Sequence, residues 1–393
     1  MKKKKVLKFL VSAIALIAVM TFAANLACLK IMLNKIEAFP ENVGDEFEFE
    51  NYANGCYNIK TDGKFKVMHI TDVHIGGGWM SVREDTKALN AVAAMITAEK
   101  PDFVVFTGDQ VFSVPYMAGT FNNKTGVTEL ASLMEKLGVY WTAAFGNHDS
   151  EIYSYYNREK VSEFYSSDEY PHCLYQPGPE NIDGYGNQVF NIKNAEGEII
   201  RSIIVFDSHS YTNGDYLGIR WIYDNIHENQ VEWYENTIKD IKEKNGGKDV
   251  PTSVFMHIPL VEYRDAWNEY LENGKKDTEN TKFVRGEIGE KDPYVYCGVG
   301  EDNLFEKMLE CKSTDSIFFG HDHLNNTILN YKGVNFVYGY SVDYFAYSGI
   351  DKQGSQRGCV VIDIAEDGKQ TITHENYYQD KYQPVIPKEE VTM

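Results

Sequence analysis

The chain has 393 residues and a formal net charge of −20. Hydrophobic residues make up 43% of it and aromatic residues 13%, so it can bury a sizeable core and is not intrinsically disordered. The acidic balance excludes nonspecific binding to nucleic acid, and we expect no nucleic-acid partner.

The N-terminus carries a basic cluster and then a long uncharged run. Five lysines lie within residues 1–8, and residues 9–29 contain no charged side chain. A run of this length is enough to cross the hydrocarbon core of a membrane as a helix. We expect an uncleaved signal anchor. The alternatives are a signal peptide that is cleaved near Ala24 or Ala27, or a lipoprotein box at residues 25–28.

In each case the lysines are expected to stay in the cytoplasm, because positive charges flank the cytoplasmic end of such segments. The sequence therefore predicts a single-pass protein of the cell membrane with its globular part outside the cytoplasm, or a secreted protein if the segment is cleaved. Six cysteines are present, and their irregular spacing indicates neither a disulfide framework nor a zinc knuckle.

Residues 30–63 are expected to form a linker and an edge strand, residues 64–384 the globular domain, and residues 385–393 a tail. The domain begins with strands predicted at 65–71, 103–107 and 139–145 and helices at 81–100 and 129–137. This β-α-β-α-β order implies a sheet with right-handed crossovers.

The second half of the domain is predicted to add helices and strands in a less regular order. Helices are expected at 153–165, 228–244 and 303–311, a hairpin at 189–192 and 199–207, and strands at 252–256 and 315–319. Strands at 327–331, 334–338, 359–364 and 371–374 are expected to complete a second sheet. Residues 264–300 are interpreted as a long loop over the functional site.

The predicted strands end in side chains that can bind metals. Gly146-Asn147-His148-Asp149 directly follows the strand at 139–145 and offers no apolar residue to pack. Alone it would be a polar turn, but four other apolar runs end in the same way. The residues at these endings are Asp72, His74, Asp109, Asn147, His148, His257, His321 and His323.

Their position and chemistry indicate a centre with two metals. Ligands of α/β sheets bind beyond the carboxyl ends of the strands. Imidazole and carboxylate donors without cysteine suit Zn, Fe, Mn and similar divalent ions. Seven or eight donors are too many for one tetrahedral zinc, and they fit two metals about 3.5–4 Å apart, the arrangement used for displacement at phosphorus.

The ordered set resembles the signature of the calcineurin-like metallophosphoesterases, which is D-x-H, G-D, G-N-H-[DE], a lone H and G-H-x-H. The corresponding stretches here are Asp72-Val73-His74, Gly108-Asp109, Gly146-Asn147-His148-Asp149, His257 and Gly320-His321-Asp322-His323. The similarity spans about residues 64–330. Its wider context looks like the Ser/Thr-phosphatase-like branch near the purple acid phosphatases.

The resemblance implies a four-layer α/β/β/α sandwich of two mixed β-sheets and a metal-dependent phosphoric ester hydrolase. It implies one metal held by Asp72, His74, Asp109 and His323, and another held by Asp109, Asn147, His257 and His321. A hydroxide between the two ions would attack phosphorus, and His148 would contact the phosphate and protonate the leaving oxygen. The metal identity stays open, because Phe112 stands where purple acid phosphatases carry a ligand tyrosine.

Three functions are open at this point. The favoured one is a membrane-tethered hydrolase of phosphate monoesters. A phosphodiesterase or nucleotide hydrolase would use the same residues, and a non-catalytic, metal-stabilised surface domain is the third. The intact His148 argues against the last, because it lies outside the implied set of metal ligands.

Several other residues have structural roles in this interpretation. Asp149 is expected to brace the turn, His69 to lie in the core and His209 to lie in a loop. Arg83, Arg158 and Arg264 lie near motif strands and could hold phosphate, although a solvated arginine is the default for each.

Overall fold

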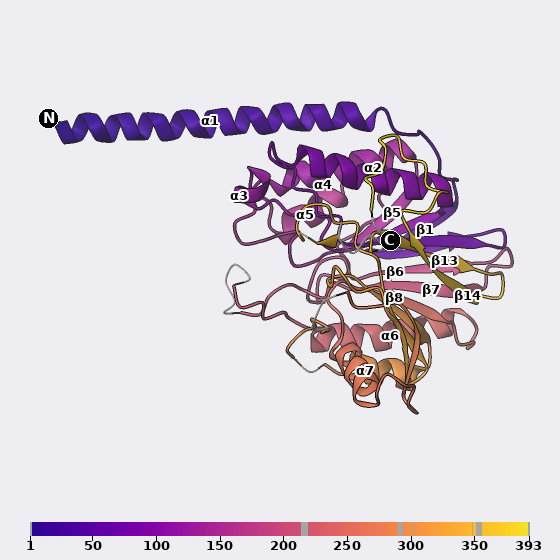
Figure 1. The fold of residues 1–393 in the computed structure, drawn as a ribbon. Coiled ribbons are helices and arrows are strands. Elements are labelled where there is room, and N and C mark those ends of the chain that lie inside the picture. The colour runs from indigo at the N-terminus through magenta and orange to yellow at the C-terminus, as the bar shows by residue number, and fades with distance from the viewer. Residues whose placement is uncertain are drawn as a thin grey trace.

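The structure is a computed structural model that describes residues 2–213, 219–289, 294–300, 302–347, 349–350 and 356–391. Two mixed β-sheets lie face to face, and helices cover the outer face of each sheet (Figure 1). This arrangement confirms the predicted four-layer sandwich. One apolar cluster fills the space between the sheets, and two others lie between the sheets and their helices.

The five-stranded sheet contains the β-α-β-α-β unit and has the order β14-β13-β3-β4-β5. Its strands are β3 (Phe65–Ile70), β4 (Phe103–Thr107), β5 (Tyr140–Ala144), β13 (Gly358–Ile364) and β14 (Gln370–Asn376). Strands β3, β4 and β5 are parallel, so their carboxyl ends lie at one end of the sheet. The connecting helices α2 (Val82–Glu99) and α4 (Asn123–Leu137) pack on its outer face (Figure 1).

The nine-stranded sheet has the order β1-β2-β6-β7-β8-β10-β12-β11-β9. Its strands are β1 (Glu48–Ala53), β2 (Cys56–Lys60), β6 (Gln188–Lys193), β7 (Ile199–Val205), β8 (Thr252–Phe255), β9 (Thr281–Arg285), β10 (Thr314–Phe319), β11 (Ile328–Tyr331) and β12 (Val334–Tyr338). The central strands β7, β8, β10 and β12 are parallel. Strand β1 is an edge strand, and β6 and β7 pair as an antiparallel hairpin, as predicted.

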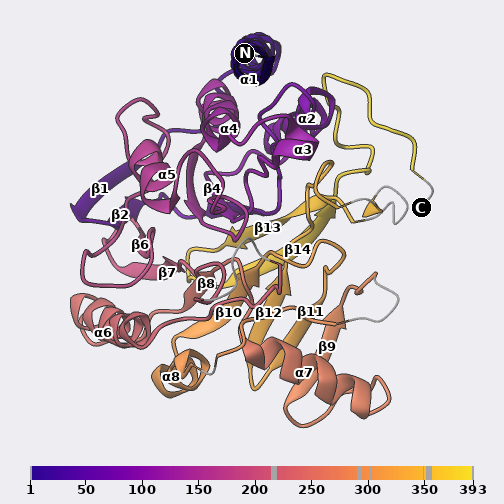
Figure 2. The same ribbon diagram turned by 90° about the vertical axis from the view of Figure 1, so that its left-hand side faces the viewer.

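The remaining helices are distributed over both sides of the sandwich. They are α3 (Pro115–Ala118), α5 (Arg158–Tyr165), α6 (Glu228–Lys244), α7 (Val261–Glu272) and α8 (Leu304–Cys311). Helices α6, α7 and α8 lie on the outer side of the nine-stranded sheet (Figure 2). Helix α5 covers only the last part of the helix predicted at 153–165.

Two of the strands that were expected in the second sheet belong to the first, so that part of the prediction was wrong. Strand β13 pairs antiparallel with β3, and β14 pairs with β13. Cys359, Val360 and Ile362 are all buried, which is typical of a central strand that packs on both faces. Strands β11 and β12 join the nine-stranded sheet as expected.

The segment 264–300 is not the single long loop that was predicted. Its first residues complete α7, and β9 forms an edge of the nine-stranded sheet by pairing with β11. Tyr263, Ala266 and Trp267 have the spacing of one helical face and are buried against the sheet. The charged residues between them obscure this period in the sequence. Residues 290–293 lie outside the described residues.

Helix α1 (Lys2–Ile36) extends beyond the apolar run into the segment that was predicted to be a linker. Met32 and Ile36 have exposed fractions of only 1% and 2%, because they pack against α2 and α4. Within the described residues, α1 is the one helix long and apolar enough to span a membrane, a test that a signal sequence also passes. Because Met32 and Ile36 are buried, the second half of α1 is part of the folded body.

The C-terminal segment that was expected to be a tail lies against the five-stranded half. The Nδ2 atom of Asn90 on α2 donates to the carbonyl oxygen of Ile386 at 2.8 Å. Glu389 forms an ion pair with Arg357 at 3.2 Å. These contacts hold the described part of the segment, up to residue 391, on the domain.

Candidate metal centre

The side chains predicted from the strand endings converge at one end of the two sheets. The first three endings follow β3, β4 and β5 in one sheet, and the other two follow β8 and β10 in the facing sheet. Because all five strands lie in parallel parts of their sheets, their carboxyl ends lie side by side. Both sheets therefore contribute to one site.

The donor atoms form two groups that share one carboxylate. In each group the donor atoms lie within 4.8 Å of one another. One group is Asp72, His74, Asp109 and His323, and the other is Asp109, His257 and His321. The remaining predicted donor, Oδ1 of Asn147, lies 3.2 Å from Nε2 of His257. The structure thus brings all seven predicted ligand residues together.

Asp109 lies between the two groups. Its Oδ2 atom is 3.4 Å from Nε2 of His74 and 3.3 Å from Nε2 of His257. Its Oδ1 atom accepts a hydrogen bond from the backbone N–H of His148 at 2.8 Å. The carboxylate therefore faces both donor groups and also fixes the loop that carries His148.

The backbone of the donor residues is strained. The φ angle is 53° at Asp72, 51° at His74, 51° at Asp109 and 84° at His321. A left-handed conformation at a residue other than glycine costs about 1–3 kcal/mol and persists only where surrounding contacts impose it. In this site the strain turns successive side chains toward a common centre.

Asp149 supplies some of those contacts, as expected from the sequence. Its Oδ2 atom accepts hydrogen bonds from the backbone N–H groups of Gly146 at 2.8 Å and Asp109 at 3.0 Å. Its Oδ1 atom accepts one from Val111 at 3.0 Å. One buried carboxylate therefore ties the loop after β4 to the loop after β5.

Arg158 is not a solvated arginine, contrary to the default expectation. It forms an ion pair with Asp207 at 2.5 Å and donates to the carbonyl oxygens of Gly146 and His209 at 2.8 and 3.2 Å. The guanidinium group therefore holds the loops after β5 and β7 together. The ring of His209 lies within hydrogen-bond distance of Gln230 at 2.8 Å, which supports a structural role for this loop histidine.

Asp343 is a buried carboxylate of the site that the sequence analysis missed. Its oxygens lie 4.0 Å from Nδ1 of His74 and 3.5 Å from Nδ1 of His323. Carboxylates in this position fix the orientation of histidines that bind metals through the other nitrogen. A signal was present, because Asp343 follows the predicted strand 334–338, whose carboxyl end also points to the site.

Glu151 was also missed, although it lies only three residues after His148. Its Oε1 atom is 2.8 Å from Nδ1 of His148 and accepts a hydrogen bond from the hydroxyl of Tyr211 at 3.3 Å. The same hydroxyl accepts a hydrogen bond from Nδ2 of Asn147 at 2.9 Å. The carboxylate thus fixes the ring of His148, whose side chain keeps an exposed fraction of 23%.

The carboxylates of the site favour positive charge at two of its histidines, whereas burial lowers the pKa of His321 and His323. Burial lowers the pKa of His74, but the carboxylates of Asp343 and Asp109 outweigh it and raise that pKa to about 10. Burial likewise opposes protonation of His257, while Asp109 raises its pKa to about 9. Groups that would hold a proton so tightly lie in a field that also attracts metal cations.

The unpaired atoms of the site also fit bound metal. Both ring nitrogens of His74, Oδ2 of Asp109 and Nδ1 of His323 are buried without a hydrogen-bond partner. A buried polar atom without a partner costs about 1–3 kcal/mol. Coordination of cations by His74 and Asp109 would remove this cost. The donor set therefore fits two divalent ions.

The site opens into a cavity of about 1190 Å³. Asp109, His148, His321 and His323 line the cavity together with many aromatic side chains, which include Phe112, Tyr116, Tyr153, Trp221 and Tyr296. The described lining residues include no lysine or arginine, so neither Arg83 nor Arg264 holds the expected phosphate position.

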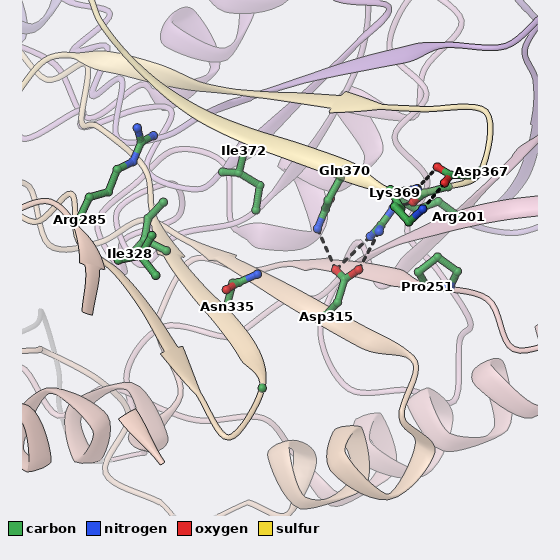
Figure 3. Close-up of a pocket in the computed structure, with 13 residues that line it drawn as sticks. Arg201, Pro251, Arg285, Asp315, Ile328, Asn335, Asp367, Lys369, Gln370 and Ile372 are labelled. Carbon is green, nitrogen blue, oxygen red and sulfur yellow. Dashed lines mark hydrogen bonds and ion pairs between the residues drawn. The ribbon is translucent and has the colours of Figure 1, made fainter. Parts of the chain in front are cut away.

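A second cavity, of about 580 Å³, lies between β14 and the nine-stranded sheet (Figure 3). Four of its charged side chains form ion pairs, Arg201 with Asp315 and Lys369 with Asp367. Arg201 forms an ion pair with Asp315 at 2.7 Å, and Gln370 donates to the same carboxylate at 2.8 Å. These contacts join β7, β10 and β14, so the cavity has a structural network rather than a set of converging donors.

Comparison with solved structures shows which class of protein has this fold. A solved dimetal phosphatase from Danio rerio matches the structure with a TM-score of 0.52 and 11% sequence identity, over 81% of this chain and 98% of that one. At this identity the match shows the fold alone. The fold is that of an α/β metallophosphatase, and the clustered donors fit this class.

The family can be stated more closely. The calcineurin-like phosphoesterase model matches residues 65–325, and the chain belongs to that family. Two similar proteins of Arabidopsis thaliana are named "Probable inactive purple acid phosphatase 28" and "29". The first is 27% identical over 74% of this chain and 73% of its own length, and the second is 29% identical over 79% and 80%.

Proposed function

We propose that the chain is a membrane-tethered, two-metal phosphoesterase that hydrolyses phosphate monoesters, with its catalytic domain at residues 64–384. The observation that carries this proposal is the pair of donor groups that share Asp109 in the lining of a cavity, beside His148. Asp72, His74, Asp109 and His323 would hold one ion, and Asp109, Asn147, His257 and His321 the other. Mn, Fe and Zn all suit these donors.

The protein side chains have separate tasks in this proposal. Two bound cations would polarise the phosphoryl oxygens and supply a nucleophile from water at neutral pH. His148 donates a proton to the leaving oxygen. Because Nδ1 faces the carboxylate of Glu151, Nε2 is the nitrogen available to the substrate. Glu151 orients the ring.

Hydrolysis of p-nitrophenyl phosphate and of its bis ester tests the proposal. The protein loaded with Mn, Zn or Fe should hydrolyse the monoester, and Asp109→Asn should not. A higher kcat/KM for the bis ester would favour the phosphodiesterase or nucleotide hydrolase, which would use the same ligands. Absence of turnover of either ester by the metal-loaded protein would contradict the proposal.

The names of the plant relatives favour a second candidate, a metal-binding domain without turnover. Against it, His148 lies outside both donor groups and is held by Glu151 in the cavity. A domain that uses metals only for stability gains nothing from a fixed imidazole beside them. The same assay separates the two candidates, because this domain would bind metal and hydrolyse neither ester.

The membrane tether and the export of the domain are also proposed. The lysines within residues 1–8 and the apolar run behind them support an anchor whose lysine-rich end stays in the cytoplasm. Protease added to intact cells with a permeable outer layer should remove the domain. A domain that is protected until the cells are lysed would contradict the proposed topology.

A further inference from the structure

The free part of α1 leaves the folded body at the end of the sandwich that carries the metal centre. Asn25 is the last contact on this side: its Nδ2 atom lies 3.4 Å from the carbonyl oxygen of Gly119, and its Oδ1 atom accepts from the backbone N–H of Trp79 at 3.2 Å. Trp79 follows the glycines after His74, and Gly119 ends α3, whose first residues line the cavity. The helix then projects past this end of the sandwich (Figures 1 and 2).

The free part of the helix is short for a membrane span. The apolar residues that precede the contact run from Phe9 to Ala24, which at 1.5 Å per residue is about 24 Å. A bilayer core is about 30 Å thick. Beyond Asn25 the helix is bound to the domain, and Nζ of Lys35 donates to Thr86 at 2.8 Å. A membrane crossed by α1 must therefore reach the level of Asn25.

The loops at that level expose large apolar side chains. Trp79, Met80, Tyr116, Phe121, Ile152 and Trp221 have exposed fractions between 47% and 80%. All six belong to loops or short helices at the end of the sandwich that carries the metal centre, and Tyr116 and Trp221 line the cavity itself. Tryptophan and tyrosine are enriched where proteins meet the lipid headgroups.

We propose that this surface, the apolar rim formed by these six residues, docks on the bilayer from which α1 emerges. The proposal rests on the membrane tether of the proposed function. The cavity then opens onto the headgroup layer, and the substrates are phosphate esters carried on lipids. Because all six residues of this surface are uncharged, docking depends on apolar insertion rather than on anionic lipid.

Tryptophan quenching tests the docking in the full-length protein. The protein is reconstituted into phosphatidylcholine vesicles, with and without lipids brominated on their acyl chains. The five tryptophans include Trp79 and Trp221 on the rim and Trp233 on α6, which covers the outer face of the nine-stranded sheet. Brominated lipid should lower the total emission by roughly a fifth or more, because two of the five indoles would lie at the interface.

Matched substitutions assign the signal. Trp79→Phe with Trp221→Phe should abolish most of the quenching, and Trp233→Phe should leave its absolute size unchanged. Quenching should persist at high salt. The docking is overturned if the wild-type protein is not quenched, or if the double variant is quenched as strongly as the wild type.

Activity in the same vesicles separates this inference from the proposed function. A diacylglycerol phosphate in the vesicles should be hydrolysed with a kcat/KM at least about tenfold above that for glycerol phosphate in solution, and equal values would overturn the lipid substrate. Quenching without hydrolysis of any ester would contradict the phosphoesterase and support the docking. Hydrolysis of p-nitrophenyl phosphate without quenching would support the phosphoesterase and contradict the docking.

Discussion

At the scale of single residues, the proposed function assigns metal binding to buried side chains and proton donation to a partly exposed one. The proposed ligands Asp72, Asp109 and His257 are at most 1% exposed, whereas the side chain of His148 is 23% exposed and faces the cavity. Its backbone N–H is bound to Asp109, so the ring stays close to the shared carboxylate.

Replacing His148 should therefore impair turnover and leave metal binding intact. We expect His148→Ala to lower kcat by about 10²–10⁴-fold with an alkyl phosphate, because the leaving alkoxide loses its proton donor. The loss should be smaller with p-nitrophenyl phosphate, whose leaving group needs little protonation. Kinetics with both esters and metal analysis of the variant check this. Loss of metal from the variant would contradict its place outside the ligand set.

Glu151→Gln should separate positioning of the imidazole from proton donation. The amide keeps the size of the side chain but not the charge that orients and stabilises the ring of His148. We expect a loss of roughly tenfold in kcat, with KM unchanged. The loss should be larger for alkyl than for aryl esters, an effect that a general loss of packing would not produce. Equal losses for both esters would show that Glu151 acts only on structure.

At this scale the sequence indicated which donor residues come together, but it missed the residues that support them. Each donor belongs to a short motif directly after a strand, so it can be found without knowledge of the fold. Asp343 has no such motif and reaches His74 and His323 only because β12 lies beside β10 in the sheet. The structural role of Arg158 likewise depends on its ion pair with Asp207, a contact that the sequence does not reveal.

At the scale of elements, buried carboxylates bind the strand-end loops to one another and to a helix. Asp149 joins two of these loops, and Asp85 on α2 joins a third. The Asp85 carboxylate accepts hydrogen bonds from the backbone N–H groups of Gly76 and Gly77 at 2.7 and 3.0 Å. The glycine turn after His74 is therefore fixed by a helix.

Asp149→Ala should destabilise this arrangement even without metal. It leaves three buried backbone N–H groups without an acceptor, each at a cost of about 1–3 kcal/mol. We expect the free energy of unfolding in chelator to fall by at least about 2 kcal/mol, measured by denaturant titration. Asp363→Asn, on an exposed position of β13, is the control and should change it by less than about 0.5 kcal/mol. Equal effects would contradict the bracing role.

The elements that were predicted wrongly are those whose partners lie far away in the sequence. The early β-α-β-α-β unit is local, and each strand pairs with the next one along the chain. Strand β13 instead pairs with β3, almost 300 residues earlier, and its apolar sequence does not indicate which strand it pairs with. In 264–300, alternating charges hid a helix that tertiary packing makes clear.

At the scale of the whole molecule, α1 belongs partly to the domain and partly to its surroundings. Its second half packs on α2 and α4 through Met32 and Ile36, while Met20 is 62% exposed. The sequence predicted the apolar run but placed its end at residue 29, because Lys30 and Lys35 interrupt the hydropathy. In this segment Met32, Leu33 and Ile36 pack against the body.

Truncation of Met32 should therefore affect the stability of the domain. We expect Met32→Ala to lower the free energy of unfolding in detergent by about 2–5 kcal/mol, as for other buried large side chains. Met20→Ala, the matched control on the free half of the same helix, should change it by less than about 0.5 kcal/mol. If both variants unfold like the wild type, α1 does not pack on the domain.

Counting the bound metal ions shows whether two of them share Asp109. The folded full-length protein, saturated with each of Mn, Zn and Fe and then freed of excess metal, should retain two equivalents of at least one of them per chain. Asp109→Asn should retain fewer than two, and His148→Ala the full two. A wild-type protein that binds at most one ion under all three conditions, while remaining folded, would contradict the account.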